Sequence, residues 1–135
     1  MSVIELQHVA KSYRTVKALD DLCLDVPEGS IFGLMGPNGA GKTTSIKLML
    51  GLMKPDAGSV AVLGETPGSD TIELRRHLGF VPEDFALYSA MTGEEILAFN
   101  AALYHCSTAG KVADLQKIFD LPLKRRISGY SKGMR

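Results

Sequence analysis

The stretch Gly36-Pro-Asn-Gly-Ala-Gly-Lys-Thr43 decides the fold of this chain of 135 residues. It fits the phosphate-loop pattern Gly-x4-Gly-Lys-Ser/Thr. Its glycines allow the backbone to wrap a phosphate and to aim successive N–H groups at it. Lys42 supplies a full positive charge for β- and γ-phosphates, and the Thr43 hydroxyl can ligate Mg²⁺. The pattern therefore predicts a nucleotide-binding site.

The residues on either side of this loop favour the same interpretation. Ile31–Met35 is a continuous apolar run, which predicts a strand buried on both faces. From Lys42 to about Leu50 the apolar residues have helical spacing, and Gly51 ends that helix. A strand, a glycine-rich loop and a helix, in this order, are what a phosphate site requires. The positive N-terminus of the helix then faces the bound anion.

Strand patterns dominate the chain before Pro82. Val3–Val9 and Leu22–Val26 alternate between apolar and polar residues, and they predict an antiparallel pair. Three further elements are expected: a strand at Ser59–Leu63, a short helix at Thr71–His77 and a short strand at Leu78–Val81.

Helical patterns dominate after Pro82. Thr92-Gly-Glu-Glu95 is a capping box, and it predicts a helix that continues to about His105. A second helix is expected from about Lys111 to Phe119. We therefore place a boundary at residues 82–91, with a β subdomain and phosphate-loop core at 1–83 and a helical subdomain at 84–135.

Composition excludes several classes of protein. The chain is 45% hydrophobic and 22% charged, with 15 basic and 15 acidic side chains, which indicates a globular domain. No segment approaches the roughly 20 apolar residues of a membrane span, and the N-terminus has no secretory-signal pattern. We therefore expect a cytoplasmic location. The two cysteines and three histidines have no metal-like spacing.

The charge distribution gives only a weak argument for a nucleic-acid partner. No acidic residue follows Asp120, whereas basic residues do: Lys124, Arg125, Arg126, Lys132 and Arg135. Because a single aromatic residue accompanies these cations, a solvated basic face is the favoured interpretation, and no nucleic-acid partner is expected.

Several classes of protein carry phosphate loops: GTPases, small-molecule kinases, helicases and transporter ATPases. The absence of an Asn-Lys-x-Asp guanine-recognition motif argues against a GTPase.

The whole chain resembles the nucleotide-binding domain of ABC transporter ATPases. Its Lys11-Ser-Tyr13 lies where this family has an aromatic residue that stacks on adenine, so the resemblance makes Tyr13 the adenine platform. The sequence of the phosphate loop matches the family's usual Walker A motif. It implies an ATP-binding set of Gly36, Pro37, Asn38, Gly39, Ala40, Gly41, Lys42, Thr43 and Thr44.

Two further motifs resemble this family and also depart from it. Leu78-Gly-Phe-Val-Pro-Glu83 resembles the Q-loop, with Glu83 where glutamine is usual; a carboxylate there can still ligate Mg²⁺. Tyr130-Ser-Lys-Gly-Met134 resembles the signature motif and keeps Ser131 and Gly133, while Lys132 replaces a glycine. This wording is similar to the ABC-2-type export branch. In the family, the signature contacts the γ-phosphate held by the other protomer.

The resemblance implies an α/β fold: a P-loop NTPase (RecA-like) core with an N-terminal antiparallel β subdomain, followed by a helical subdomain. We find no Walker B motif, which would supply an Asp for Mg²⁺ and a general-base Glu. We therefore expect a fragment that lacks the C-terminal half of the core, binds ATP and hydrolyses it poorly. The apolar faces beside Ile31–Met35 and Leu78–Val81 would then be exposed, which predicts marginal stability or association.

The implied function is that of an ATP-binding subunit of an ABC transporter, which couples Mg-ATP binding and hydrolysis to export. Its implied partners are a transmembrane permease and a second ATPase domain in a homodimer or heterodimer. Residues 84–91 would form part of the groove that receives a helix of the permease. It would be peripheral on the cytoplasmic face of the membrane. Alternatives are a soluble non-transport ABC ATPase, a nucleotide-responsive regulatory module and another P-loop enzyme such as a kinase.

Overall fold

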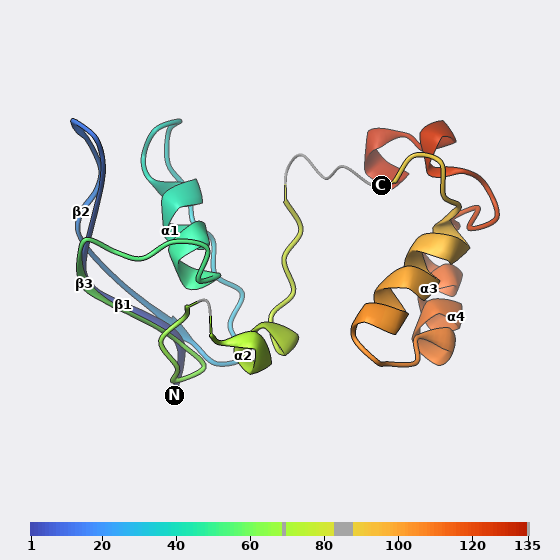
Figure 1. Ribbon diagram of the computed structural model, residues 1–135, viewed down its shortest axis with the longest axis horizontal. Coiled ribbons are helices and arrows are strands. Elements are labelled where there is room, and N and C mark those ends of the chain that lie inside the picture. The colour runs from blue at the N-terminus through green and yellow to red at the C-terminus, as the bar shows by residue number, and fades with distance from the viewer. Residues whose placement is uncertain (69, 83–87, 135) are drawn as a thin grey trace. The chain divides into compact units, whose positions relative to one another are not determined.

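The computed structural model describes residues 1–68, 70–82 and 88–134 (Figure 1). Contacts within the chain divide it into two compact units, Met1–Gly79 and Phe80–Arg135. Each unit has a hydrophobic core of its own. The division falls a few residues before the boundary placed at 82–91 from the sequence.

The first unit contains a three-stranded antiparallel sheet. Strands β1 (Ser2–Tyr13) and β2 (Val16–Pro27) form a hairpin, and β3 (Ala57–Val62) pairs with the other edge of β1. The strand order is therefore β2-β1-β3. The predicted antiparallel pair of early strands is confirmed. Both strands run longer than predicted because backbone pairing continues to Tyr13 and Val16, beyond the apolar alternation.

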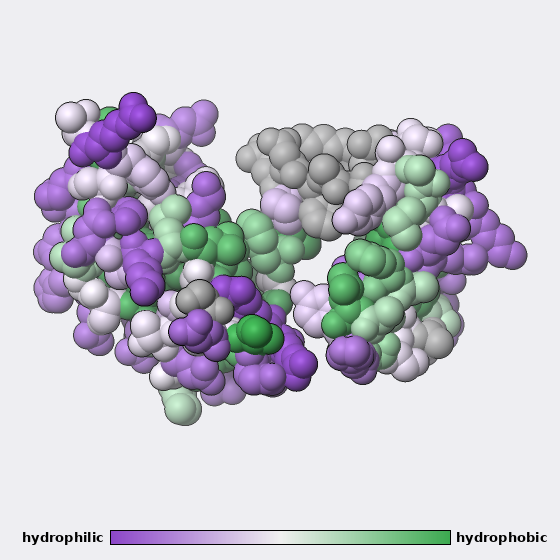
Figure 2. Space-filling model, viewed as in Figure 1, coloured by the Kyte–Doolittle hydropathy of each residue, from purple (hydrophilic) through white to green (hydrophobic). Residues whose placement is uncertain are grey.

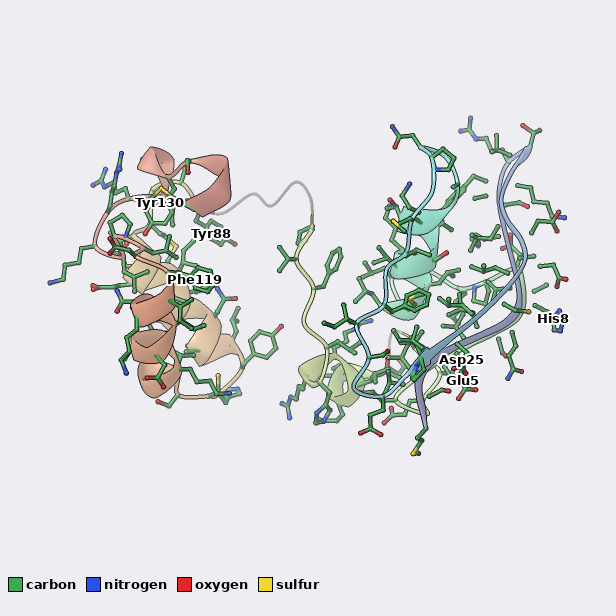
Figure 3. All side chains as sticks on the ribbon, turned by 180° about the vertical axis from the view of Figure 1, so that it is seen from behind. Glu5, His8, Asp25, Tyr88, Phe119 and Tyr130 are labelled. Carbon is green, nitrogen blue, oxygen red and sulfur yellow. The ribbon has the colours of Figure 1, made fainter. Side chains whose placement is uncertain are left out.

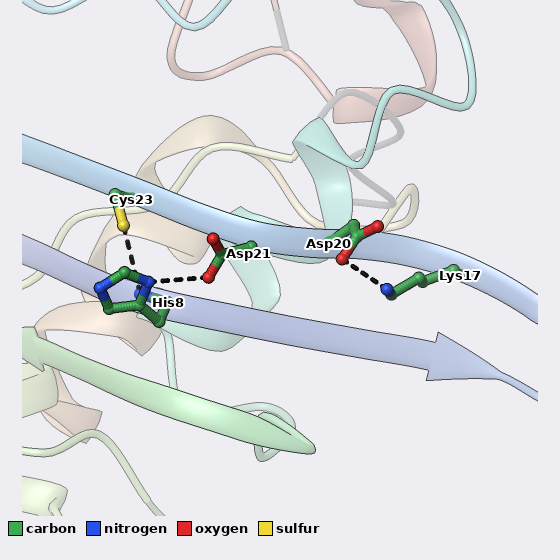
Figure 4. Close-up of polar contacts among 5 residues, drawn as sticks. All are labelled: His8, Lys17, Asp20, Asp21 and Cys23. Atoms are coloured by element: carbon green, nitrogen blue, oxygen red, sulfur yellow. Dashed lines mark hydrogen bonds and ion pairs between the residues drawn. The ribbon is translucent and has the colours of Figure 1, made fainter.

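Irregular register in the hairpin places a polar group on its surface (Figure 4). His8 and Asp21 have positive φ angles of 50° and 55°, and the His8 ring Nδ1 lies 2.8 Å from Asp21 Oδ1. The His8 backbone N–H donates to Cys23 Sγ at 3.3 Å. Lys17 and Asp20 form an ion pair nearby. All these groups are exposed, so the two charged contacts add little to stability.

The core of the first unit lies between the sheet and helix α1 (Lys42–Met49). Leu48 is the buried apolar residue of α1, and Leu74 comes from the short helix α2 (Ile72–Arg76). The sheet contributes the remaining buried members of this cluster: Leu6, Val9, Leu19, Val60 and Val62. Burial of each such aliphatic side chain stabilises the fold by about 1.5–3 kcal/mol, so the sheet and α1 fold as one body.

Two predicted strands are wrong. Ile31–Met35 and Leu78–Val81 are not strands, and Ile31, Met35 and Val81 are 105%, 91% and 87% exposed. A strand buried on both faces needs hydrogen-bonded neighbours and covering layers. In the described part of the chain, the only sheet is β2-β1-β3, and neither segment pairs with it. The apolar runs are therefore present, but neither is buried as a strand: Leu78 packs partly against the core, while Ile31, Met35 and Val81 stay exposed.

The second unit is helical, as predicted. Helix α3 (Gly93–Leu103) begins at the expected capping box: the Glu95 N–H donates to Thr92 Oγ1 at 3.2 Å, and the Thr92 N–H donates to Glu95 Oε2 at 2.7 Å. Helix α4 (Ala109–Ile118) follows. Two 3₁₀ turns end the unit, η1 (Ile127–Gly129) and η2 (Lys132–Met134).

Apolar side chains are both buried and exposed in the second unit. Ile96, Ile127 and Tyr130 form its core. Figure 2 shows hydrophobic surface over α3, where Phe99 and Leu103 are exposed. An apolar groove of about 140 Å³ is lined by Leu97, Val112, Leu115, Gln116, Phe119, Leu121 and Leu123. Among the described residues, no helix combines the length and the apolar character needed to cross a membrane.

Candidate functional site

The loop that precedes α1 is built by backbone geometry that glycine alone adopts easily. Gly39 and Gly41 have φ angles of 87° and 86°. A turn within the loop is closed by the Ala40 N–H, which donates to the Pro37 carbonyl at 3.2 Å. Gly41 is the N-cap residue of α1, and no side chain caps this end of the helix. The N–H groups of the first helical turn are therefore open to an external acceptor.

The end of the loop is anchored on β2. A Cβ atom added to Gly41 would lie 2.5 Å from the Ala18 carbonyl oxygen and 2.5 Å from Leu19 Cδ2. The Gly41 carbonyl accepts the Ser45 N–H at 2.8 Å and the Ser45 hydroxyl at 3.1 Å. The close approach places the start of α1 directly against β2, and the two bonds belong to the first turn of the helix itself.

Lys42 points back over the loop. Its Nζ donates to the Gly36 carbonyl at 2.6 Å and to the Pro37 carbonyl at 2.8 Å. Thr43 beside it is exposed, whereas Thr44 is buried. Lys42 and Thr43 both lie in the first turn of α1, where no side chain caps the helix. In the described ranges no cluster of three or more His, Cys, Asp or Glu side chains could hold a metal ion.

Tyr13 occupies the end of β1, where it pairs with Val16 across the hairpin turn. It is 44% exposed, and its hydroxyl donates to Met53 Sδ at 3.2 Å. In Figure 1 the tip of the hairpin and the loop before α1 extend toward the same end of the first unit. Tyr13 thus presents a half-exposed ring beside the turn of the hairpin.

Sequence reasoning missed two residues that hold this tip. Met53 lies just after α1 and contacts Tyr13 as described. Asp56 accepts hydrogen bonds from Lys11 Nζ at 2.6 Å and from the Ser12 backbone N–H at 2.7 Å. The Lys11 ammonium and the Ser12 N–H hold the pKa of Asp56 below its ordinary value of 3.8. The Pro-Asp pair that follows the helix was the only local signal for such a contact.

The signature-like segment belongs to the second unit. Tyr130 is buried, and its hydroxyl donates to the Pro122 carbonyl at 2.9 Å; Figure 3 shows it beside the 3₁₀ turns. Ser131 and Gly133 are exposed, and Lys132 begins η2. Tyr130 therefore anchors the segment in the core and leaves Ser131 and Gly133 at the surface.

The remaining predicted residues lie partly outside the described ranges. Glu83, the expected Mg²⁺ ligand of the Q-loop, is one of them. Residues 84–87 of the expected permease-facing segment are others. Residues 88–91 of that segment are described, and Tyr88 makes an edge-to-face contact with Phe99 at a centroid distance of 5.9 Å.

Comparison with known proteins identifies the family of the chain. The family model described as "ABC transporter" matches residues 19–135. The uncharacterised ABC transporter ATP-binding protein YhcH of Bacillus subtilis is 35% identical over 99% of this chain and 45% of its own length. SkfE of the same organism, the SkfA peptide export ATP-binding protein, is 37% identical over 78% of this chain and 43% of its own length.

A solved structure agrees in fold. The ATP-binding subunit of an ABC transporter matches with a TM-score of 0.85 and 32% identity, over 98% of this chain and 57% of that one. The α/β fold of the P-loop NTPases, predicted from the sequence, is thereby confirmed. The chain spans about half the length of the relatives that it matches.

Proposed function

The chain belongs to the ABC transporter family, and on this premise we propose that it is the nucleotide-binding part of an ATP-binding subunit. The observation that carries the proposal is the start of α1. There, uncapped N–H groups, the Lys42 ammonium and the Thr43 hydroxyl lie together after a glycine-rich loop. This arrangement of donors suits the β- and γ-phosphates of a nucleoside triphosphate.

Each predicted residue has a distinct role in this proposal. The backbone of Gly36–Thr44 surrounds the phosphates, Lys42 balances their charge and Tyr13 stacks on adenine. Mg²⁺ would be held by the exposed Thr43 hydroxyl together with Glu83. A hydroxyl and a carboxylate are oxygen ligands of the kind that this ion prefers. Bound there, Mg²⁺ supplies charge for the phosphate oxygens.

Hydrolysis by these 135 residues should be slow. They contain no apolar run that ends in the Asp-Glu pair of a Walker B motif. Lys42 and the helix terminus can still stabilise negative charge on the γ-phosphate, but no identified base orients the attacking water. We therefore expect this chain to bind ATP much better than it hydrolyses it.

The partners follow from the family and from the relatives. SkfE is named as a peptide export protein, which supports export as the process served by the whole subunit. Ser131, Lys132 and Gly133 would contact the nucleotide of a second ATPase domain, in a homodimer or heterodimer. A transmembrane permease would hold the subunit at the cytoplasmic face of the membrane and would recognise the exported substrate.

Thermal unfolding of the chain with Mg-ATP, with Mg-GTP and without nucleotide tests this proposal. A ligand present at 100 times its dissociation constant adds about 2.7 kcal/mol of stability, which is roughly 10–20 °C in Tm for a unit of this size. Lys42→Ala should abolish the shift. The matched control is Lys47→Ala, which removes an exposed lysine from the last turn of the same helix. A cooperative transition with no nucleotide shift, or an unchanged shift in Lys42→Ala, would refute the proposal.

A further inference from the structure

Asp56 connects the segment after α1 to the tip of the β1–β2 hairpin. Its carboxylate accepts from Lys11 Nζ and from the Ser12 N–H, at 2.6 and 2.7 Å. Its own backbone N–H donates to the Ala10 carbonyl at 2.9 Å. One residue thus binds three consecutive positions of β1 that lie more than 40 residues earlier in the chain.

These contacts lie where β1 extends beyond its pairing with β3. On its β3 side, β1 is paired only as far as Ala10, which faces Ala57. Beyond Ala10 the strand continues to Tyr13 and pairs with β2 alone. Such a two-stranded extension is marginally stable without support. Asp56 supplies this support, because it lies just before β3 and reaches the positions that β3 does not.

The ion pair is well placed to hold the tip. The Lys11 side chain is only 17% exposed and that of Asp56 is 48% exposed, so solvent screens this pair less than a fully exposed one. The Ser12 N–H bond is directed at the residue immediately before Tyr13. A displacement of Ser12 therefore displaces the Tyr13 ring.

We propose that Asp56 is a positioning residue for the adenine platform, which holds Tyr13 at a fixed height relative to the phosphate loop. The inference rests on the proposed function, in which Tyr13 stacks on adenine. The linkage is short: the loop leads into α1, α1 leads to Met53 and Asp56, and both of these residues contact the tip that carries Tyr13. Asp56 thereby ties the distance between the base and phosphate ends of the site to the frame of α1.

The test uses two ligands and a double-mutant cycle, with dissociation constants of Mg-ATP and Mg-tripolyphosphate measured by calorimetry. Tripolyphosphate needs only the phosphate loop, whereas ATP also uses the platform. Loss of a base–aromatic stack weakens binding about tenfold. We expect Asp56→Asn to weaken ATP binding by up to about that factor and to leave tripolyphosphate binding unchanged. In a Tyr13→Ala background, Asp56→Asn should have no further effect on ATP.

One control variant and one further test variant separate the positioning role from a general effect on stability. Asp25→Asn removes a carboxylate that accepts from Ser2 at 2.6 Å, in the same hairpin but far from its tip, and it should leave both affinities unchanged. Lys11→Met removes the ion pair from its other side and should reproduce the selective loss for ATP. It also provides the test if Asp56→Asn does not fold.

The outcomes distinguish this inference from the proposed function. Equal weakening of both ligands by Asp56→Asn, or an additive loss with Tyr13→Ala, would overturn the positioning role. If Tyr13→Ala leaves ATP binding unchanged while Lys42→Ala abolishes it, the phosphate site stands and the inference about Asp56 falls. If Lys42→Ala changes neither ligand, the proposed function itself fails.

Discussion

Substitution of Gly41 by alanine, with Gly39→Ala as its matched control, separates two reasons for glycine in the phosphate loop. The two residues have nearly the same φ, 86° and 87°, so both variants strain the backbone equally. An alanine in the left-handed region costs about 1–2 kcal/mol. The reduced entropy of the unfolded chain offsets about 0.4–1 kcal/mol of this. Strain alone thus predicts a net loss of roughly 0.5–1 kcal/mol at either site.

Only Gly41 has a steric reason in addition. Its Cβ would lie 2.5 Å from a backbone oxygen and from a leucine methyl of β2, whereas nothing lies within 4 Å of a Cβ at Gly39. A backbone carbonyl cannot rotate away as a flexible side chain can. The forced shift of α1 against the sheet costs about 1–3 kcal/mol, as overpacking in cores does. Gly41→Ala should therefore lose roughly 1.5–4 kcal/mol in total.

Thermal unfolding followed by circular dichroism, without nucleotide, measures both losses. For a unit of 60–100 residues, 1 kcal/mol corresponds to about 4–8 °C in Tm. Gly39→Ala should lower Tm by a few degrees and Gly41→Ala by roughly 6–30 °C. Equal decreases in the two variants would refute the steric argument. No decrease in Gly41→Ala would also refute the assignment of strain.

Four further outcomes are expected. Tyr130→Phe removes the bond from a buried hydroxyl to the Pro122 carbonyl and should cost about 1 kcal/mol in urea unfolding; a neutral result would contradict the anchoring role. Thr92→Ala breaks the capping box and should also cost about 1 kcal/mol, with some loss of helical ellipticity; unchanged ellipticity and midpoint would argue against the cap. The folded pKa of Asp56 is lowered, so its stabilising contribution is present above pH 3.8 and is lost as the pH falls through the folded value. The Tm difference between the chain and Asp56→Asn should therefore shrink below about pH 4, and a constant difference would show that the carboxylate charge is unimportant. Ile31→Lys should reduce concentration-dependent association in sedimentation velocity, because Ile31 is fully exposed; equal association would place the contact elsewhere.

Local signals in the sequence predicted local structure well. The capping box at Thr92 sets the start of α3 through bonds that span only three residues, so a short pattern suffices. The same holds for the phosphate loop and α1, where glycines and a following helical pattern are contiguous. The bonds of Lys42 to the loop carbonyls were not predicted, although they span only five and six residues.

Structure that depends on distant residues was predicted poorly. Ile31–Met35 has the composition of a buried strand, but a strand is made by its neighbours, and the described residues provide none. The role of Asp56 escaped prediction for the same reason, since its partners on β1 lie 44 and 45 residues away. For the signature segment, the sequence drew attention to Ser131, whereas the structure adds Tyr130 as the buried residue that holds it.

The two bonds that Lys42 makes to its own loop compete with any ligand for its ammonium. An anion that recruits this ammonium must compensate for two carbonyl acceptors at 2.6 and 2.8 Å. A monovalent ion such as chloride forms weak hydrogen bonds and would not compensate for the loss of both carbonyl bonds. A polyphosphate offers several charged oxygens at once, so the ammonium exchanges bonds to neutral carbonyls for bonds in which both partners are charged. If the loop binds phosphate as proposed, we expect the two Lys42 bonds to favour ligands with several charged oxygens over small monovalent anions.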